Sequence, residues 1–137
     1  MRVQDIHTIF HGGAIPPFSA IRSTFVDVRD VATCVLRAVE KHAHAPSQPP
    51  RERYLLVGNS SPVSPQAAAD VLRARYPGRR DVIQEGNPGE AYPDMTWGFD
   101  ASKAREDLLG GRPWIGFEES VVDSAESFLR LEQEGEA

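Results

Sequence analysis

The stretch that decides the expected fold runs from residue 24 to residue 40 and reads TFVDVRDVATCVLRAVE. Its first part, Phe25 to Val28, is short, apolar and rich in β-favouring side chains, which is typical of a buried strand. Asp30 then occupies the place of a helix N-cap, where a carboxylate accepts hydrogen bonds from free backbone N–H groups. Apolar residues recur at steps of three and four, at Val31, Val35, Ala38 and Val39. A strand followed by a helix to about Ala43 is predicted.

The segments that follow extend this pattern. Tyr54 to Val57 predicts a second buried strand, and two strands separated by a helix indicate a parallel βαβ crossover. Ser64 and Pro65 open another helix, because the serine hydroxyl can cap it and proline lacks only an N–H that the first turn does not use. The remaining elements expected are a short strand at 81–84, a helix from Asp100 to Gly110, and an amphipathic helix from about Glu118 to Leu131. The predicted fold class is α/β.

Composition narrows the classes of function. The chain has 137 residues, 40% of them hydrophobic and 26% charged, which fits one globular domain. Its net charge of −5 and scattered basic residues argue against nucleic acid as a partner. Cys34 is the single cysteine, so no intrachain disulfide can form, and it is interpreted as a small buried hydrophobe. No apolar run is long enough for a membrane span, and a cytoplasmic location is expected.

Few side chains suggest chemistry by themselves. His7 and His11 are spaced to share one helix face, but no third ligand is evident and a metal site is not expected. His42 and His44 fit the C-terminal end of a helix, where its dipole favours positive charge. Asp27 and Arg29, on either side of Val28, which is expected to be buried, are interpreted as a local polar network, and Asp30 as a cap. A loop with aromatic and sulfur-containing side chains either lines a pocket or closes the core, at Tyr92, Met95, Trp97 and Phe99.

Several motifs in order resemble one family over nearly the whole chain. They are Ile15-Pro16-Pro17, Phe25 to Ala32, Arg53 to Val57, the helix after Ser64, Asp100 to Arg105 with Leu109-Gly110, and the last helix from Glu118 to Phe128. Together they resemble the C-terminal portion of the extended short-chain dehydrogenase/reductases, within the NAD(P)-dependent epimerase/dehydratase superfamily, and in particular the NADP-dependent aldehyde, ketone and dihydroflavonol reductases.

This resemblance implies a partial Rossmann-like sheet edge with the C-terminal substrate-binding lobe, lacking the N-terminal dinucleotide-binding half. Residues 1–131 would form that lobe as a single incomplete domain, and 132–137 an acidic tail. The family's chemistry needs a tyrosine with a lysine four residues later, which lowers the tyrosine pKa. The only lysines are Lys41 and Lys103, preceded at that spacing by Arg37 and Phe99. The glycine fingerprint that binds the dinucleotide is also missing.

No catalytic, cofactor-binding or metal-binding residue is therefore assigned in this chain. NADP is the cofactor that the resemblance implies for a full-length relative, and whether this chain is an enzyme stays open. The resemblance puts Ile21, Arg22 and Thr24 near the substrate pocket. The leading hypothesis is a substrate-lobe portion of a carbonyl reductase, present as a truncated product or partial gene model, with a small carbonyl substrate or a complementary Rossmann half as partner. The alternative is a free-standing interaction or small-ligand-binding module derived from that lobe.

Overall fold

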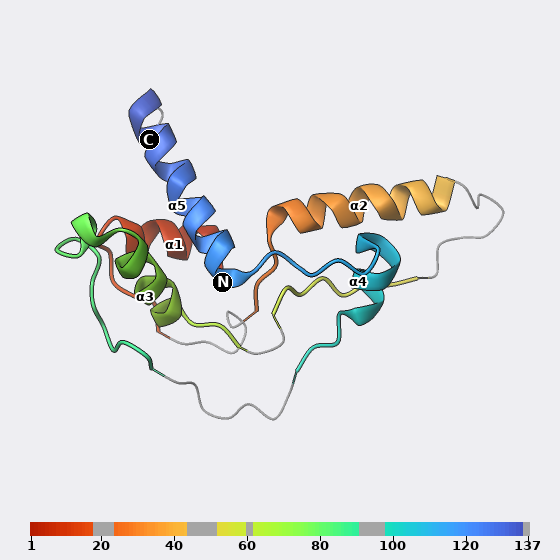
Figure 1. Cartoon of the computed structure of the whole chain (residues 1–137), viewed down its shortest axis with the longest axis horizontal. Coiled ribbons are helices and arrows are strands. Elements are labelled where there is room, and N and C mark those ends of the chain that lie inside the picture. Colours follow the sequence, from red (N-terminus) through yellow and green to blue (C-terminus); the bar gives the residue numbers. More distant parts are fainter. Residues whose placement is uncertain (18–23, 44–51, 60–61, 91–97, 136–137) are drawn as a thin grey trace.

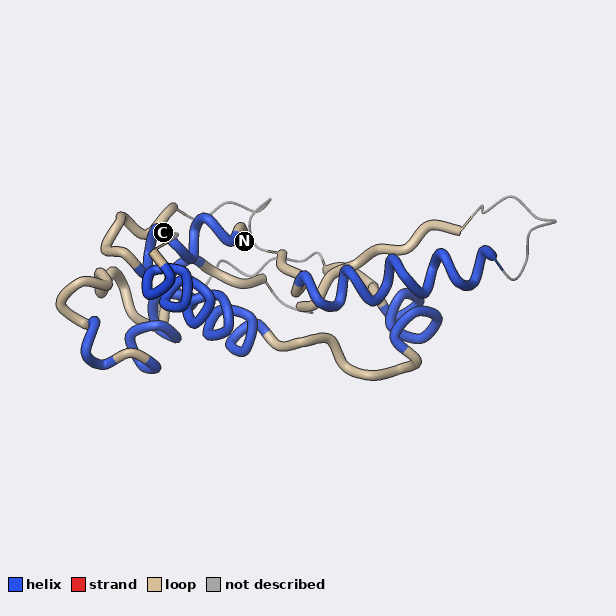
Figure 2. Tube along the Cα trace, turned by 90° about the horizontal axis from the view of Figure 1, so that it is seen from above, coloured by secondary structure: helices blue, strands red, loops and turns tan. Residues whose placement is uncertain are grey.

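A computed structural model describes residues 1–17, 24–43, 52–59, 62–90 and 98–135 of the chain. Within these ranges the regular elements are all helical (Figure 1): α1 (Val3–Phe10), α2 (Val28–Ala43), α3 (Pro65–Arg75), the short 3-10 helix η2 (Pro77–Arg79), α4 (Ser102–Leu109) and α5 (Phe117–Glu134). Helices α1, α3 and α5 form one group, and α2 and α4 form another beside it (Figures 1 and 2). The two groups give the molecule an elongated shape.

The predicted strand at Phe25 to Val28 is wrong, because Asp27 begins a helix there. The backbone N–H of Arg29 donates to Asp27 Oδ1 at 2.9 Å, and the N–H of Val31 donates to the Asp27 carbonyl at 3.1 Å. This is the hydrogen bonding of an N-cap. The predicted helix is confirmed, but it starts at Val28, so Asp30 lies inside the first turn and is not the cap. Val28, expected to be buried, is exposed.

The other predicted strands are also missing from the described part of the chain. Tyr54 to Val57 has no ladder partner among the residues that the structure describes, and the N–H of the following residue, Gly58, donates to the Phe25 carbonyl at 2.8 Å. A sheet needs a row of such bonds between neighbouring strands. Residues 81–84 form a turn after η2, because the Arg79 carbonyl accepts from the N–H groups of Val82 and Ile83. The α/β fold class, with its Rossmann-like sheet edge, is therefore corrected to a helical fold in the described residues.

The other predicted helices, which correspond to α3, α4 and α5, are confirmed. Ser64 caps α3 by accepting from the Ala67 N–H at 2.5 Å, with Pro65 in the first turn. Gly110 ends α4 in the left-handed conformation at φ +63°, where an L side chain is disfavoured. Helix α5 runs to Glu134, so it includes the first three residues of the acidic segment 132–137.

The first group is packed around one apolar core. Helices α1, α3 and α5 contribute its buried residues together with Ile83 from the turn after η2: Ile6, Ile9, Phe10, Ala68, Ala69, Leu72, Val121 and Ala125. Arg79 lies at the edge of this core, with its guanidinium 4.3 Å from the centre of the Phe10 ring.

The second group has a smaller core. Cys34 of α2 packs against Ala104, Leu108 and Leu109 of α4, with Tyr54, Leu56 and Trp114 at the margin. The fully buried Asp30 links α2 to the segment that enters α5: Oδ1 accepts from Arg112 Nη2 at 2.7 Å and Oδ2 from the Ile115 N–H at 2.8 Å. The rings of Phe25 and Phe117, edge to face at 5.3 Å, join the two groups.

Candidate functional site

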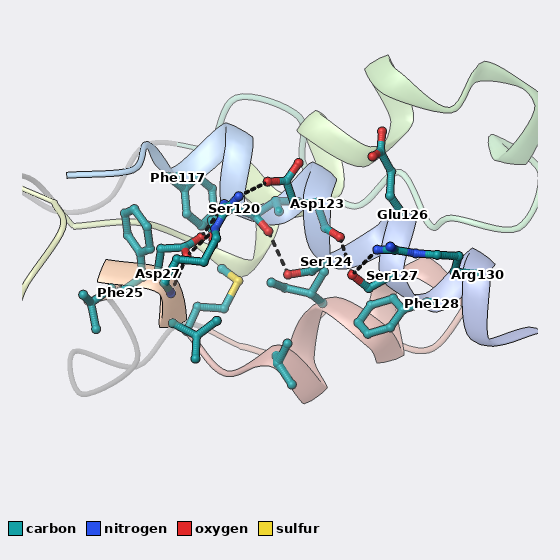
Figure 3. A pocket seen from close by; sticks show the side chains of 17 residues that line it. Phe25, Asp27, Phe117, Ser120, Asp123, Ser124, Glu126, Ser127, Phe128 and Arg130 are labelled. Carbon is teal, nitrogen blue, oxygen red and sulfur yellow. Dashed lines mark hydrogen bonds and ion pairs between the residues drawn. The ribbon is translucent and has the colours of Figure 1, made fainter. Parts of the chain in front are cut away.

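A groove of about 530 Å³ opens between α1, the start of α2 and one face of α5 (Figure 3). Its apolar lining comes largely from Val3, Ile6, Phe25, Phe117, Val121 and Phe128. The first residues of α2 and the outer face of α5 bring charged and hydroxyl groups to its rim. The groove is therefore suited to a small molecule with an apolar body.

Arg29 is the most strongly held charge in this groove. Its Nε and Nη2 donate to the two Asp27 oxygens at 2.9 Å each, and Nη1 lies 2.7 Å from Asp123 Oδ2, with Glu119 Oε1 at 3.8 Å from Nη2. The hydrogen bonds from Arg29 lower the pKa of Asp27 from 3.8 to about 2 despite its burial. The same bonds raise the pKa of Arg29. Because carboxylates already occupy its donors, Arg29 is not free to anchor an anion.

The Ser120 side chain is hydrogen-bonded to Asp27, and the other two serine hydroxyls of the lining bond within α5. Ser124 donates to the Ser120 carbonyl at 2.7 Å, and Ser127 donates to the Asp123 carbonyl at 2.9 Å (Figure 3). The described residues that line the groove include no tyrosine, lysine, histidine or cysteine. The groove thus presents none of the tyrosine and lysine chemistry on which the reductases that the sequence resembles depend.

The predicted substrate-binding residues are only partly placed by the structure. Ile21 and Arg22 lie outside the described residues. Thr24 is half-buried, and its carbonyl accepts a hydrogen bond from the amino group of Met1. It directly precedes Phe25, which lines the groove. Contact of these three residues with a substrate stays a prediction.

A tyrosine and a lysine do meet in space, although not at the spacing that the family uses. Lys41 Nζ lies 2.9 Å from the hydroxyl of Tyr54, which also lies 2.5 Å from Glu52 Oε2 and 3.0 Å from Asp107 Oδ2. Burial and the hydrogen bond to Glu52 raise the pKa of Tyr54, opposite to the shift that lysine gives the family's tyrosine. This cluster lies away from the groove, with Lys41 on α2, Asp107 on α4, and Glu52 and Tyr54 on the segment 52–59. No sequence spacing indicated it.

The histidines form packing contacts. The His7 and His11 rings stack at 4.2 Å on one face of the chain, as their spacing predicts. His11 Nδ1 lies 2.9 Å from the His7 carbonyl and Nε2 lies 2.5 Å from Glu132 Oε1, so both ring nitrogens have partners. No group of three metal-ligating side chains occurs among the residues that the structure describes. His42 lies in the last turn of α2 as predicted, whereas His44 is outside the described residues.

The other residues singled out in the sequence either pack in the fold or lie outside the described residues. Cys34 is buried as expected, and burial raises the pKa of its thiol. Of the aromatic loop, Tyr92, Met95 and Trp97 lie outside the described residues, while Phe99 is exposed beside a hollow of about 400 Å³ next to α4. None of the helices in the described ranges is long and apolar enough to cross a membrane.

The sequence and the fold of this chain are similar to reductases of the short-chain dehydrogenase kind. One relative is the Candida albicans protein "Putative NADPH-dependent methylglyoxal reductase GRP2", 30% identical over 114 residues that make up 82% of this chain and 31% of that protein. A solved structure named SsCR_L211H has a TM-score of 0.73 and 27% identity, covering 93% of this chain and 36% of the other. No family model matches.

A second solved structure agrees with the first. It belongs to work on structure-guided engineering of a reductase to attenuate substrate inhibition, and has a TM-score of 0.72 and 28% identity over 92% of this chain and 35% of the other. The chain therefore spans about a third of the length of the proteins it matches. The predicted likeness to reductases is confirmed at this coarser level.

Proposed function

We propose that this chain is the substrate-binding portion of an NADPH-dependent carbonyl reductase of the extended short-chain type. By itself it does not reduce carbonyl compounds, and NADP is bound by the portion that its relatives have in addition. The cytoplasmic location expected from the sequence stays a prediction.

One observation carries this proposal: nearly the whole chain matches about a third of solved reductases at a TM-score of 0.73, while its sequence has no tyrosine followed by a lysine at the fourth position. The chain contains a groove with an apolar lining, and the described residues of that lining include no tyrosine or lysine. Recognition of a small carbonyl compound is the role that such a groove supports.

The groove also indicates the kind of substrate. Phe25 and Phe117 pack edge to face beside it, and both line it, so they offer apolar surface to an aliphatic or aromatic substituent. The charged side chains of the lining are Arg29 and Arg130 against Asp27, Asp123 and Glu126, and Asp27 and Asp123 hold the Arg29 guanidinium. A substrate carboxylate therefore meets no excess of positive charge there. Uncharged aldehydes and ketones are therefore the substrate class proposed.

Two measurements test the proposal. The purified 137-residue chain, mixed with NADPH and methylglyoxal, is expected to consume no NADPH. A chimaera in which this chain replaces the matched third of the Candida albicans protein is expected to consume NADPH with an uncharged carbonyl substrate, and that protein without the third is the control. NADPH consumption by the isolated chain, or a folded chimaera without activity, contradicts the proposal.

A free-standing ligand-binding module is the second candidate, because the groove is present in this chain by itself. If the isolated chain binds a small ketone in an NMR titration while the folded chimaera stays inactive, this candidate is favoured. Val3→Trp should fill the groove and abolish binding, since Val3 lines it and is exposed. Val82→Trp is the matched control, because Val82 is an exposed valine outside the groove lining.

A further inference from the structure

Helix α2 has two apolar faces, only one of which is covered. The inner face carries the buried Asp30 and Cys34, together with Ala38, which packs at the margin of the smaller core. The outer face carries an apolar stripe, defined as Val28, Ala32, Val35, Leu36 and Val39. At 3.6 residues per turn these five positions span roughly 100° of the helix circumference.

This stripe is unusually exposed for its composition. Its large side chains retain 76% exposure at Val28, 54% at Val35, 65% at Leu36 and 63% at Val39. The other exposed large apolar residues in the described ranges are spread over separate segments: Val3, Leu55, Val82, Phe99 and Leu131. A surface helix normally has one apolar stripe toward the core and a polar remainder. A second contiguous apolar surface marks an interaction site.

The charge around the stripe indicates how it binds. Arg29 forms ion pairs with Asp27 and Asp123, and Arg37 pairs with Glu40 at 3.0 Å. The charged residues next to the stripe therefore have partners on this chain. The stripe itself contains no polar side chain. A partner would therefore gain mainly from burying apolar surface and not from ion pairs.

The stripe is continuous with the groove. Val28, its first residue, also lines the groove, as do Phe25 and Arg29. A partner that covers α2 from Val28 onward therefore reaches the groove and can form a further wall of it. Docking on the stripe and enclosure of a ligand in the groove are thus linked through one residue.

The lengths of the similar proteins bear on what could cover the stripe. In the solved reductases this chain corresponds to 36% and 35% of a longer chain, so most of each protein is additional to the region matched. Resting on the proposed function, we propose that the α2 stripe is the docking surface for the NADPH-binding portion of the reductase, and that docking places this portion at the Val28 end of the groove.

Leu36→Lys tests the docking surface in two settings. In the isolated chain the substitution is expected to leave the melting temperature unchanged, because Leu36 is exposed on a helix and lysine is a good helix former. In the chimaera it is expected to lower the melting temperature by about 5 °C or more, because the lysine is then buried without a partner. Leu131→Lys, an exposed position on α5 away from the stripe, is the matched control and should have no effect in either setting.

Each outcome separates docking from function. If Leu36→Lys changes the melting temperature equally in the isolated chain and in the chimaera, the docking surface is wrong, even if the chimaera is active. If the chimaera folds and is destabilised by Leu36→Lys but is inactive, only the proposed function is wrong. A chimaera that does not fold overturns both. If sedimentation shows that the isolated chain dimerises and that Leu36→Lys abolishes the dimer, the occupant is a second copy of this chain and the proposal is wrong.

Discussion

Asp27 shows how one residue can change the local structure that a sequence pattern indicates. The short apolar run from Phe25 to Val28 is rich in β-favouring side chains and favours a strand, but the Asp27 carboxylate binds both the N–H and the guanidinium of Arg29. Strand propensity depends on packing against neighbouring strands, whereas an N-cap is a local interaction. Where no ladder partner is present, the cap determines the structure.

Asp27→Asn should reduce stability in a pH-dependent way. The pKa of Asp27 is about 2 in the folded chain against 3.8 ordinarily, so its ionised form contributes stability above about pH 4 that is lost as the pH falls through about 2. The free energy of unfolding is expected to fall by about 2 kcal/mol near neutral pH and by less than about 0.5 kcal/mol at pH 2. Urea unfolding at both pH values measures this.

The control for that experiment is Asp81→Asn, because Asp81 is an exposed aspartate in the turn after η2. It should change the free energy of unfolding little at either pH. An Asp27→Asn effect that is the same at pH 7 and pH 2 would show that the Asp27 charge does not stabilise the fold.

Asp30 should be the most sensitive charged position. It is fully buried and is bonded to Arg112 and to the Ile115 N–H. Asp30→Ala leaves that N–H without its acceptor, so the free energy of unfolding is expected to fall by about 2–3 kcal/mol. Glu40→Ala, which removes the exposed pair with Arg37, should cost less than about 0.5 kcal/mol. Chemical denaturation compares the two, and equal losses would contradict the structural role of Asp30.

The sequence predicted only a small part of the groove. Thr24 was placed near the substrate by family resemblance, and the structure puts it next in the chain to Phe25 of the groove lining. The faces of α1 and α5 that line the groove could not be found from spacing. They meet through packing between segments more than a hundred residues apart, which local patterns do not encode.

At the scale of elements, helices were predictable and strands were not. Ser64, Pro65 and Gly110 fix the ends of α3 and α4 through bonds within a few residues of each helix, so the sequence alone predicts them. A strand instead depends on a partner that is distant in the sequence. Tyr54 to Val57 keeps the expected apolar pattern, with Leu56 against the smaller core and Leu55 exposed, but no ladder forms in the described residues.

The loop after η2 is held on α3 by Gln66, and Gly86 is the residue that permits the close approach. Gln66 Nε2 donates to the Glu85 carbonyl at 2.8 Å, and its Oε1 accepts from the Asn87 N–H at 3.0 Å. Gly86 has φ +60°, and a Cβ there would lie 2.2 Å from Gln66 Oε1 and 2.7 Å from Ile15 Cδ1. An alanine therefore meets both backbone strain and a clash.

Gly86→Ala is expected to lower the free energy of unfolding by about 2–3 kcal/mol. Gly89→Ala is the matched control, because Gly89 has φ +72° but open space around its Cβ position. It should cost only the conformational strain, about 1 kcal/mol. Thermal or urea unfolding distinguishes the two, and similar losses would mean that the contact with Gln66 does not limit this loop.

For the whole molecule, the two helical groups should differ in local stability. Helix α5 packs against both α1 and α3 around the larger core, whereas α2 packs on α4 and leaves its stripe to solvent. Fewer buried apolar contacts lower the free energy of local opening. The amides of α2 are therefore expected to exchange with deuterium faster than those of α3 in the isolated chain, and hydrogen-exchange mass spectrometry measures this.

The chimaera provides the comparison for that prediction. Covering the stripe should slow exchange in α2 while α3 changes little. If α2 and α3 are equally protected in the isolated chain, the two groups open as one unit and the predicted difference in local stability is absent.

The exposed stripe of α2 has a consequence for how much of this protein a cell can hold. Chaperones bind contiguous apolar surface, and proteases remove chains that stay open. If the stripe is covered only by a partner, copies made in excess of that partner would be cleared, and the abundance of the partner would limit the amount of this chain. Co-expression of the two portions would then raise the level of this chain without any change in its own synthesis.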